Sequence, residues 1–517
     1  MKNLRLTLFV LTLVVLAKMA EAQASKDFPK QVNLVKMTDP GVAVIGTDDA
    51  LYGLDKAGKV LWDNKKLRKV EENRVEVLSG SELIFVSDKG LLSRNRVINV
   101  LDGKEYANTG TKGENIMGAR VVHGANQLWV MPGNKQIDVW DIDTNKKLYS
   151  LEINAPYGIA TDKMASLTAT FSGMQPITYT GKKSAILHLG LAHLGNYDLS
   201  TGKPIWMFDW KPYKVKKPNG DKGDRASKPS TGSAVMRVDQ KAGVLYFPFR
   251  TELIAVDIKT GAAKWSPKAN KTGKVRDMFI TDEGILILTI KGLQLVDKQS
   301  GAEKWDKPIK IKGAAEGLLI KDNKDFYIVS KNNLVKVDIA KKSAKTLTEK
   351  IKFQGGESFS QIEIIDDMVV LSGSQNIVGI DKTSGKIVYS TYYKAPGAGL
   401  VALAQNMVLA TVAMASSMNS MNVNSQAGNN TYYSYTPRMM SSGGSATTSA
   451  GDIMYISTKF KDSDAKGFGV ARVDKLTGKT LDKIVIGDRN PVYAVDERNG
   501  LIFYKSAKSS VALKAVQ

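Results

Sequence analysis

The chain has 517 residues, no cysteine and a formal net charge of +22 at pH 7. Without cysteine it forms no disulfide, and thiolate metal sites, cysteine nucleophiles and the lipid anchor of a bacterial lipoprotein are excluded as well. Hydrophobic residues make up 43% of the chain, so a large core can be built by packing alone.

The first 22 residues have the features of a secretory signal peptide. Lys2 and Arg5 precede an apolar run from Leu6 to Ala17, and Ala20 and Ala22 supply the small residues that a signal peptidase reads. A membrane span takes about 20 apolar residues, which neither this run nor any later stretch reaches. We therefore expect residues 1–22 to be removed on export, residues 23–517 to form the mature protein, and no transmembrane segment to remain.

One pattern returns along the rest of the chain: alternating apolar residues, an Asp, a short turn with Gly or Asn, and an aromatic residue four positions after the turn residue. Gly and Asn tolerate the positive φ of a tight turn, and the constant spacing puts every aromatic residue on the same face of its strand. The Asp can accept hydrogen bonds from the turn. The aromatic residues that we expect to dock between neighbouring units are Trp62, Tyr149, Trp206, Trp265, Trp305 and Tyr389.

Each unit also contains strand-like runs before the Asp, which gives about four short strands in about 40 to 45 residues, the size of a propeller blade. Weaker copies around Asn99, Asp338 and Asp474 fill the gaps, so that nine units and a partial tenth can be counted. We predict an all-β fold, a single β-propeller with inserted surface loops. Eight blades are the expected number, and nine or ten are the alternative.

The pattern Asp-x-x-Thr-Gly-Lys-x-x-Trp is nearly intact from Asp198 to Trp206 and recognisable from Asp257, Asp297 and Asp381. It resembles the quinoprotein-type, or PQQ-like, β-propeller repeat, over about residues 30–515. The resemblance implies eight blades with the aromatic residue docked between them. It also implies one of two functions, a non-catalytic envelope propeller or a dehydrogenase that holds PQQ and a calcium ion on the propeller axis.

The non-catalytic branch fits the residues better. The chain lacks the adjacent cysteine pair that many such dehydrogenases place against PQQ, and their catalytic Asp and calcium-ligand motifs match no position here. It resembles the propeller subunit of the outer-membrane β-barrel assembly machinery, although that subunit carries a lipid-attachment cysteine. We expect a binding or scaffold protein of the bacterial cell envelope, periplasmic, outer-membrane-associated or secreted, with no catalytic residue and no cofactor. A PQQ-dependent alcohol or sugar dehydrogenase is the alternative.

The segment with Asp141, Asp143, Asn145 and Glu152 has the ligand spacing of an EF-hand calcium loop. Lys146 stands where that loop requires Gly, and the segment coincides with a turn of the repeat. We interpret these residues as structural and predict no metal site.

Insertions interrupt the repeat at residues 157–182, 211–231 and 415–450. The last is of low complexity and is expected to be disordered. The second is rich in cations, which we take as the candidate contact with a partner: Lys211, Lys214, Lys216, Lys217, Lys222, Arg225 and Lys228. Such a loop suits an envelope protein or an anionic polymer rather than nucleic acid, although the lysines could simply keep a solvated loop soluble.

Overall fold

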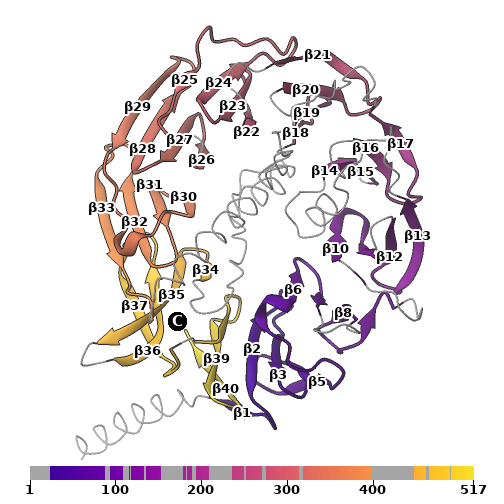
Figure 1. The fold of residues 1–517 in the computed structure, drawn as a ribbon, viewed down its shortest axis with the longest axis vertical. Helices are drawn as coiled ribbons and strands as arrows, with labels where there is room; N and C mark the ends of the chain where they lie inside the picture. The colour runs from indigo at the N-terminus through magenta and orange to yellow at the C-terminus, as the bar shows by residue number, and fades with distance from the viewer. Residues whose placement is uncertain are drawn as a thin grey trace, which may run out of the picture.

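The computed structural model describes residues 24–87, 94–108, 116, 118–132, 136–152, 178–181, 183–188, 194–208, 236–249, 252–269, 275–313, 318–396, 448–461, 465–489 and 491–516. These residues form ten four-stranded antiparallel sheets, which follow one another around a ring (Figure 1). The predicted all-β propeller is confirmed. The sheets number ten among the described residues, so the expected eight blades are corrected to the upper end of the repeat count.

The first five sheets, numbered here in chain order, are as follows. Sheet 1 is β2 (Val32–Met37), β3 (Ala43–Thr47), β4 (Leu51–Leu54) and β5 (Val60–Asn64); sheet 2 is β6 (Val75–Leu78), β7 (Leu83–Val86), β8 (Arg96–Asn99) and β9 (Glu105–Tyr106); sheet 3 is β10 (Gly118–Val122), β11 (Gln127–Met131), β12 (Gln136–Asp141) and β13 (Lys146–Glu152); sheet 4 is β14 (Thr178–Gly181), β15 (Ser184–His188), β16 (Leu194–Asp198) and β17 (Pro204–Met207); sheet 5 is β18 (Arg237–Asp239), β19 (Val244–Phe249), β20 (Glu252–Asp257) and β21 (Ala263–Ala269).

The remaining sheets complete the ring. Sheet 6 is β22 (Val275–Ile280), β23 (Ile285–Thr289), β24 (Gly292–Val296) and β25 (Ile309–Lys310); sheet 7 is β26 (Leu318–Asp322), β27 (Asp325–Ser330), β28 (Asn333–Asp338) and β29 (Ser343–Thr348); sheet 8 is β30 (Gln361–Ile365), β31 (Met368–Ser372), β32 (Asn376–Asp381) and β33 (Ile387–Tyr392); sheet 9 is β34 (Thr448–Ala450), β35 (Ile453–Lys461), β36 (Lys466–Asp474) and β37 (Thr480–Val485); sheet 10 is β38 (Tyr493–Asp496), β39 (Leu501–Ala507), β40 (Ser510–Ala515) and β1 (Ser25–Asp27). Short 3-10 turns lie at η1 (Glu72–Arg74), η2 (His123–Ala125) and η6 (Gln354–Gly356).

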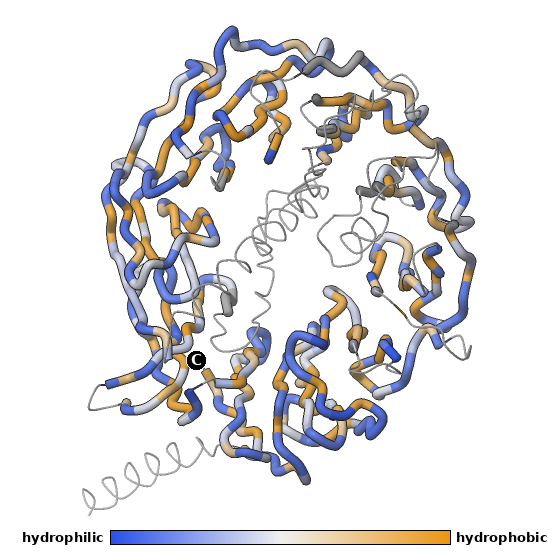
Figure 2. The backbone as a smooth tube through the Cα atoms, viewed as in Figure 1, coloured by the Kyte–Doolittle hydropathy of each residue, from blue (hydrophilic) through white to orange (hydrophobic). Residues whose placement is uncertain are grey.

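Within a sheet the first strand faces the centre of the ring and the fourth lies on the outer rim, as β30 and β33 show (Figure 1). The second strand is covered on both faces by neighbouring sheets, so that β3 and β23 are buried throughout. The rim strands face solvent, and β33 is exposed or half-buried along its length. Hydrophobic residues accordingly concentrate within the sheets, while the rim is more hydrophilic (Figure 2).

The ring is closed by pairing the two ends of the described chain. Strand β1 forms the rim strand of sheet 10 by antiparallel pairing with β40, with Ser25 opposite Ala512. Phe28 follows β1 and packs on Tyr52 of sheet 1, with ring centroids 5.0 Å apart. The same cluster contains Leu513 of sheet 10. The N-terminal strand therefore joins the last sheet to the first.

Four predicted segments fall wholly or largely outside the described residues. These are the signal peptide, residues 1–22, and the insertions at 157–182, 211–231 and 415–450, of which only residues 178–181 and 448–450 are described, in β14 and β34. In the part of the chain that the structure describes, no helix has the length and apolar character needed to cross a membrane.

Candidate functional site

The aromatic residues of the repeat lie at the contacts between successive sheets. Trp62 of sheet 1 donates its indole N–H to the carbonyl of Val100 in sheet 2, at 2.5 Å, and a Cβ added to Gly103 in that turn would lie 2.8 Å from the indole ring. Trp206 of sheet 4 repeats the arrangement on the carbonyl of Ile258, at 2.9 Å. The indole thus occupies the space left free by a turn glycine of the next sheet.

Three more of the predicted residues contact the following sheet in the same way. Trp265 donates to the carbonyl of Lys298, at 3.2 Å, and the hydroxyl of Tyr149 donates to the carbonyl of Leu199, at 2.6 Å. The Tyr389 hydroxyl donates to the carbonyl of Lys475. Trp305 is buried between sheets 6 and 7 as well, although no glycine stands in the corresponding turn of sheet 7.

The Asp residues of the repeat cap their turns. The Asp198 carboxylate accepts the backbone N–H of Ser200, at 2.7 Å, and that of Thr201, at 3.1 Å. In the calcium-like segment, Asp141 accepts the N–H and the hydroxyl of Thr144 in the same manner. Hydrogen bonds to Ser200 and Thr144 lower the pKa of Asp198 and Asp141, respectively. Among the described residues, no cluster of three His, Asp or Glu side chains could hold a metal ion.

Buried charges also join neighbouring sheets. The Lys475 ammonium of sheet 9 lies 2.9 Å from the Glu363 carboxylate of sheet 8, and both side chains are buried. Arg237 of sheet 5 lies 2.8 Å from Asp277 of sheet 6, where burial raises the pKa of the carboxyl group and the arginine partly offsets it. Each carboxylate is paired with a cation from the neighbouring sheet, and removing one partner of such a pair would leave an uncompensated buried charge.

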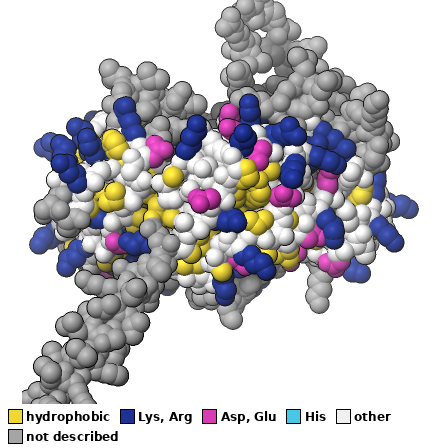
Figure 3. Space-filling model, turned by 90° about the horizontal axis from the view of Figure 1, so that it is seen from below, with side chains coloured by type: hydrophobic (Ala, Val, Ile, Leu, Met, Phe, Trp, Pro, Cys, Tyr) yellow, Lys and Arg dark blue, Asp and Glu magenta, His cyan; other side chains and the backbone are white. Residues whose placement is uncertain are grey.

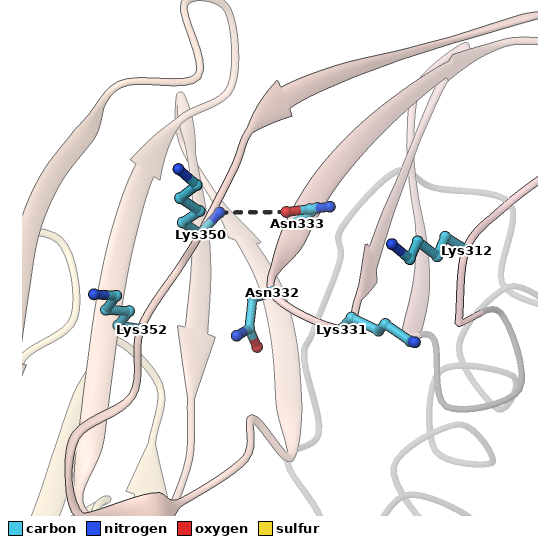
Figure 4. Close-up of a pocket in the computed structure, with 6 residues that line it drawn as sticks. All are labelled: Lys312, Lys331, Asn332, Asn333, Lys350 and Lys352. Atoms are coloured by element: carbon cyan, nitrogen blue, oxygen red, sulfur yellow. Dashed lines mark hydrogen bonds between the residues drawn. The ribbon is translucent and has the colours of Figure 1, made fainter.

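A pocket of about 280 Å³ is the candidate site for a ligand (Figure 4). Its described lining residues come from three segments of the chain. Lys312 follows β25. Lys331 and Asn332 form the turn between β27 and β28, and Asn333 begins β28. Lys350 and Lys352 lie in the connection from β29 to sheet 8. The lysines are exposed. The two asparagines lie between Lys350 and Lys352 on one side and Lys312 and Lys331 on the other (Figure 4).

The turn geometry that builds this pocket is local. Lys331 and Lys350 both adopt left-handed backbone conformations, with φ of 52° and 56°. The backbone N–H of Lys350 donates to the Asn333 side-chain oxygen, at 3.3 Å, and the N–H of Ile351 donates to the carbonyl of Asn332, at 2.8 Å. These bonds hold the segment after β29 against the β27–β28 turn. The arrangement offers positive charge and amide groups, which suit an anion.

The predicted contact residues of the 211–231 insertion lie outside the described residues, since the structure describes nothing between residues 208 and 236. The pocket lysines were not singled out in the sequence, because they are dispersed over separate connections. The edge of the ring seen in Figure 3 carries Lys and Arg side chains interspersed with Asp and Glu, rather than one continuous basic patch. The described residues that line the pocket, in contrast, are all lysines or asparagines.

Comparison with known proteins bears on the repeat. A family model described as the outer membrane protein assembly factor BamB matches residues 192–361. No curated protein sequence matches the chain.

Three solved structures are similar to this chain at low identity. The computationally designed protein Ika8 is 13% identical, with a TM-score of 0.34, over 71% of this chain and 98% of its own. BamB from Moraxella catarrhalis is 13% identical, with a TM-score of 0.32, over 66% of this chain and 83% of its own. The C-terminal WD40 domain of Sif2 is 9% identical, with a TM-score of 0.36, over 69% of this chain and 97% of its own. Such scores are too low to indicate a shared function.

The matched segment contains the repeats that begin at Asp198, Asp257 and Asp297, together with every residue that lines the pocket. The family match thus covers three of the four repeats from which the resemblance was drawn, and the fourth, at Asp381, lies beyond it. The resemblance of this chain to the PQQ-like β-propeller repeat family is confirmed.

Proposed function

We propose that this chain is an exported, non-catalytic β-propeller that acts as a binding or scaffold protein of the bacterial cell envelope, in the periplasm or at the outer membrane. Its partner is an envelope protein or an anionic polymer. The observation that carries the proposal is the match of residues 192–361 to a family model described as an outer membrane protein assembly factor.

The chemistry of the described residues supports a binding role. The repeat uses its aromatic residues to dock sheets and its Asp residues to cap turns, and the buried charges pair across sheet contacts. The pocket beside sheet 7 offers cations and amides, which suit the recognition of an anion. A propeller with such a surface presents turns and loops to partners.

The proposal is tested in two experiments on the full chain. Fractionation of cells that produce the chain with residues 1–22 intact should place it in the periplasm or with the outer membrane, processed near residue 23. Chemical crosslinking in those cells should then join it to one major envelope component.

The second experiment addresses the enzymatic alternative. Calorimetry with PQQ and calcium should give no saturable heat, and a dye-linked assay with alcohols and sugars should give no turnover. Saturable PQQ binding with turnover would replace the scaffold role with that of a quinoprotein dehydrogenase.

A further inference from the structure

The described residues that line the pocket beside sheet 7 are four lysines and two asparagines, with two lysines on either side of the asparagines (Figure 4). Glu349 precedes Lys350 in the chain but does not line the pocket. The described lining therefore carries a formal charge of +4 around a volume of about 280 Å³. Like charges brought together in this way repel one another, and an anion between them relieves the repulsion.

Two other lysines of sheet 7 are paired with carboxylates. Lys336 lies 2.5 Å from Asp325, and Lys341 lies 3.3 Å from Asp338. Among the ion pairs formed by the described residues, none involves the four pocket lysines, Lys324 or Lys345. The pocket lysines differ from Lys324 and Lys345 in that they line one cavity, where one anion can contact several of them.

The kind of cation indicates the kind of anion. Planar arginine groups bind carboxylates in a bidentate manner, whereas lysine acts as a point charge with rotatable donors and commonly binds phosphate. The cations among the described lining residues are all lysines. Asn333 directs its side-chain oxygen to the backbone N–H of Lys350, so its NH₂ group is the part offered to a ligand (Figure 4).

We propose that this pocket binds phosphate groups, in a ligand that carries two of them or more. The paired lysines on either side of Asn332 and Asn333 suit separate phosphates, with the asparagine NH₂ groups between them. The inference rests on the proposed function, because it gives the anionic partner a chemistry. A soluble diphosphate and the headgroup phosphates of an envelope lipid share this chemistry.

The test uses charge-matched variants of the full chain. The pocket variant carries Lys312→Gln and Lys352→Gln, one from each side of the asparagines. The control variant carries Lys324→Gln and Lys345→Gln, two exposed lysines of sheet 7 outside the pocket, so both variants lose the same net charge. Calorimetric titration with inorganic pyrophosphate should show one saturable site in the wild type. The pocket variant should bind about tenfold more weakly, the effect of two partly exposed ion pairs.

The control variant should bind pyrophosphate within about twofold of the wild type, and added salt should weaken binding in both, since the Debye length falls to about 8 Å at 0.15 M. A Lys312→Arg and Lys352→Arg variant, which keeps the charge, should bind more tightly than the glutamine variant. Equal weakening in the pocket and control variants, or no saturable binding in the wild type, would overturn the proposal.

Sedimentation with vesicles separates the two sources of phosphate. Wild type that sediments with phosphatidic acid vesicles but not with phosphatidylcholine vesicles, with the pocket variant left in solution, supports a lipid headgroup. Pyrophosphate binding without sedimentation supports a soluble phosphate. If the wild type is crosslinked to one major envelope component but shows no saturable binding of pyrophosphate, the proposed function stands and the phosphate site is wrong.

Discussion

At the scale of single residues, the docked indoles account for much of the contact between sheets. Trp265 of sheet 5 is buried against the turn of sheet 6 and donates a hydrogen bond there. We predict that Trp265→Ala lowers the free energy of unfolding by about 3 to 5 kcal/mol, the cost of emptying a buried aromatic site. Urea titration measures it, with Ile205→Ala on the exposed rim as the control, expected within about 0.5 kcal/mol of wild type. Similar losses in both variants would show that the indole is not docked.

Glu76 makes stability depend on pH. Burial raises the pKa of its carboxyl group from its ordinary value of 4.5 to about 7, and the attraction of Lys36 and Arg120 offsets only part of that rise. Between these two values the folded chain binds more protons than the unfolded chain, so the free energy of unfolding falls as the pH rises through this window.

Replacement of Glu76 by Gln should remove this dependence. Because the carboxyl group keeps part of its exposure, we expect the variant to be more stable than wild type at pH 8 by about 1 to 2 kcal/mol, and equal to it near pH 4. Urea titrations from pH 4 to 8 measure the difference. Glu349→Gln, at an exposed site, serves as the control, and a wild-type profile that is flat over this range would contradict the interpretation of Glu76.

At the scale of elements, the aromatic residue of one sheet and the turn residue of the next act as a pair. Where sheet 3 has Asn145 in place of Gly, the residue of sheet 2 at the docking position is Ala107, whose N–H donates to the Asn145 side-chain oxygen at 3.0 Å. The small residue leaves room for the asparagine. At this contact the two positions therefore differ from the repeat together, whereas Trp305 docks on sheet 7 where the turn has no glycine.

This pairing predicts an unequal response to the same substitution at two glycines. Gly261 has φ of 73°, and a Cβ there would lie 2.6 Å from the Trp206 ring, whereas Gly356 has φ of 74° with nothing within 4 Å. Gly356→Ala should cost about 1 to 2 kcal/mol for its left-handed backbone. Gly261→Ala should cost about 1 to 3 kcal/mol more, the effect of overpacking against the indole. Urea titration of both variants tests the pairing, and equal costs would refute it.

The repeat made most of the elements predictable. A period of two, a turn glycine and a constant spacing to the aromatic residue are local features, and they anticipate which residues contact the next sheet, as Trp206 and Gly261 do. The number of sheets could not be predicted from these local features. Sheet 2 has Ala107 where the repeat has an aromatic residue, and sheet 10 is assembled from both ends of the described chain. The lysine pocket depends on three connections that meet only in space, so no spacing in the sequence could reveal it.

At the scale of the whole molecule, the pairing of β1 with β40 should decide whether the ring stays closed. Deletion of residues 24–28 removes the rim strand of sheet 10 and the Phe28 ring that packs on Tyr52. We expect proteolysis to reach sheet 10 in the shortened chain, because its edge becomes unpaired. X-ray scattering should also show a larger radius of gyration. A chain that begins at residue 24 is the control, and identical digestion of the two would show that closure does not depend on β1.

The pairing of β1 with β40 also determines when the ring can close during protein synthesis. A ribosome produces β1 before the other described strands and β40 after them, so β1 waits for its partner until the other nine sheets have been made. The other nine sheets each come from one consecutive stretch of chain and can form in order of synthesis. A product that stops early has no strand to receive β1 and leaves apolar faces of its first and last sheets uncovered. Such a fragment offers proteases and chaperones a direct means of telling unfinished chains from finished ones.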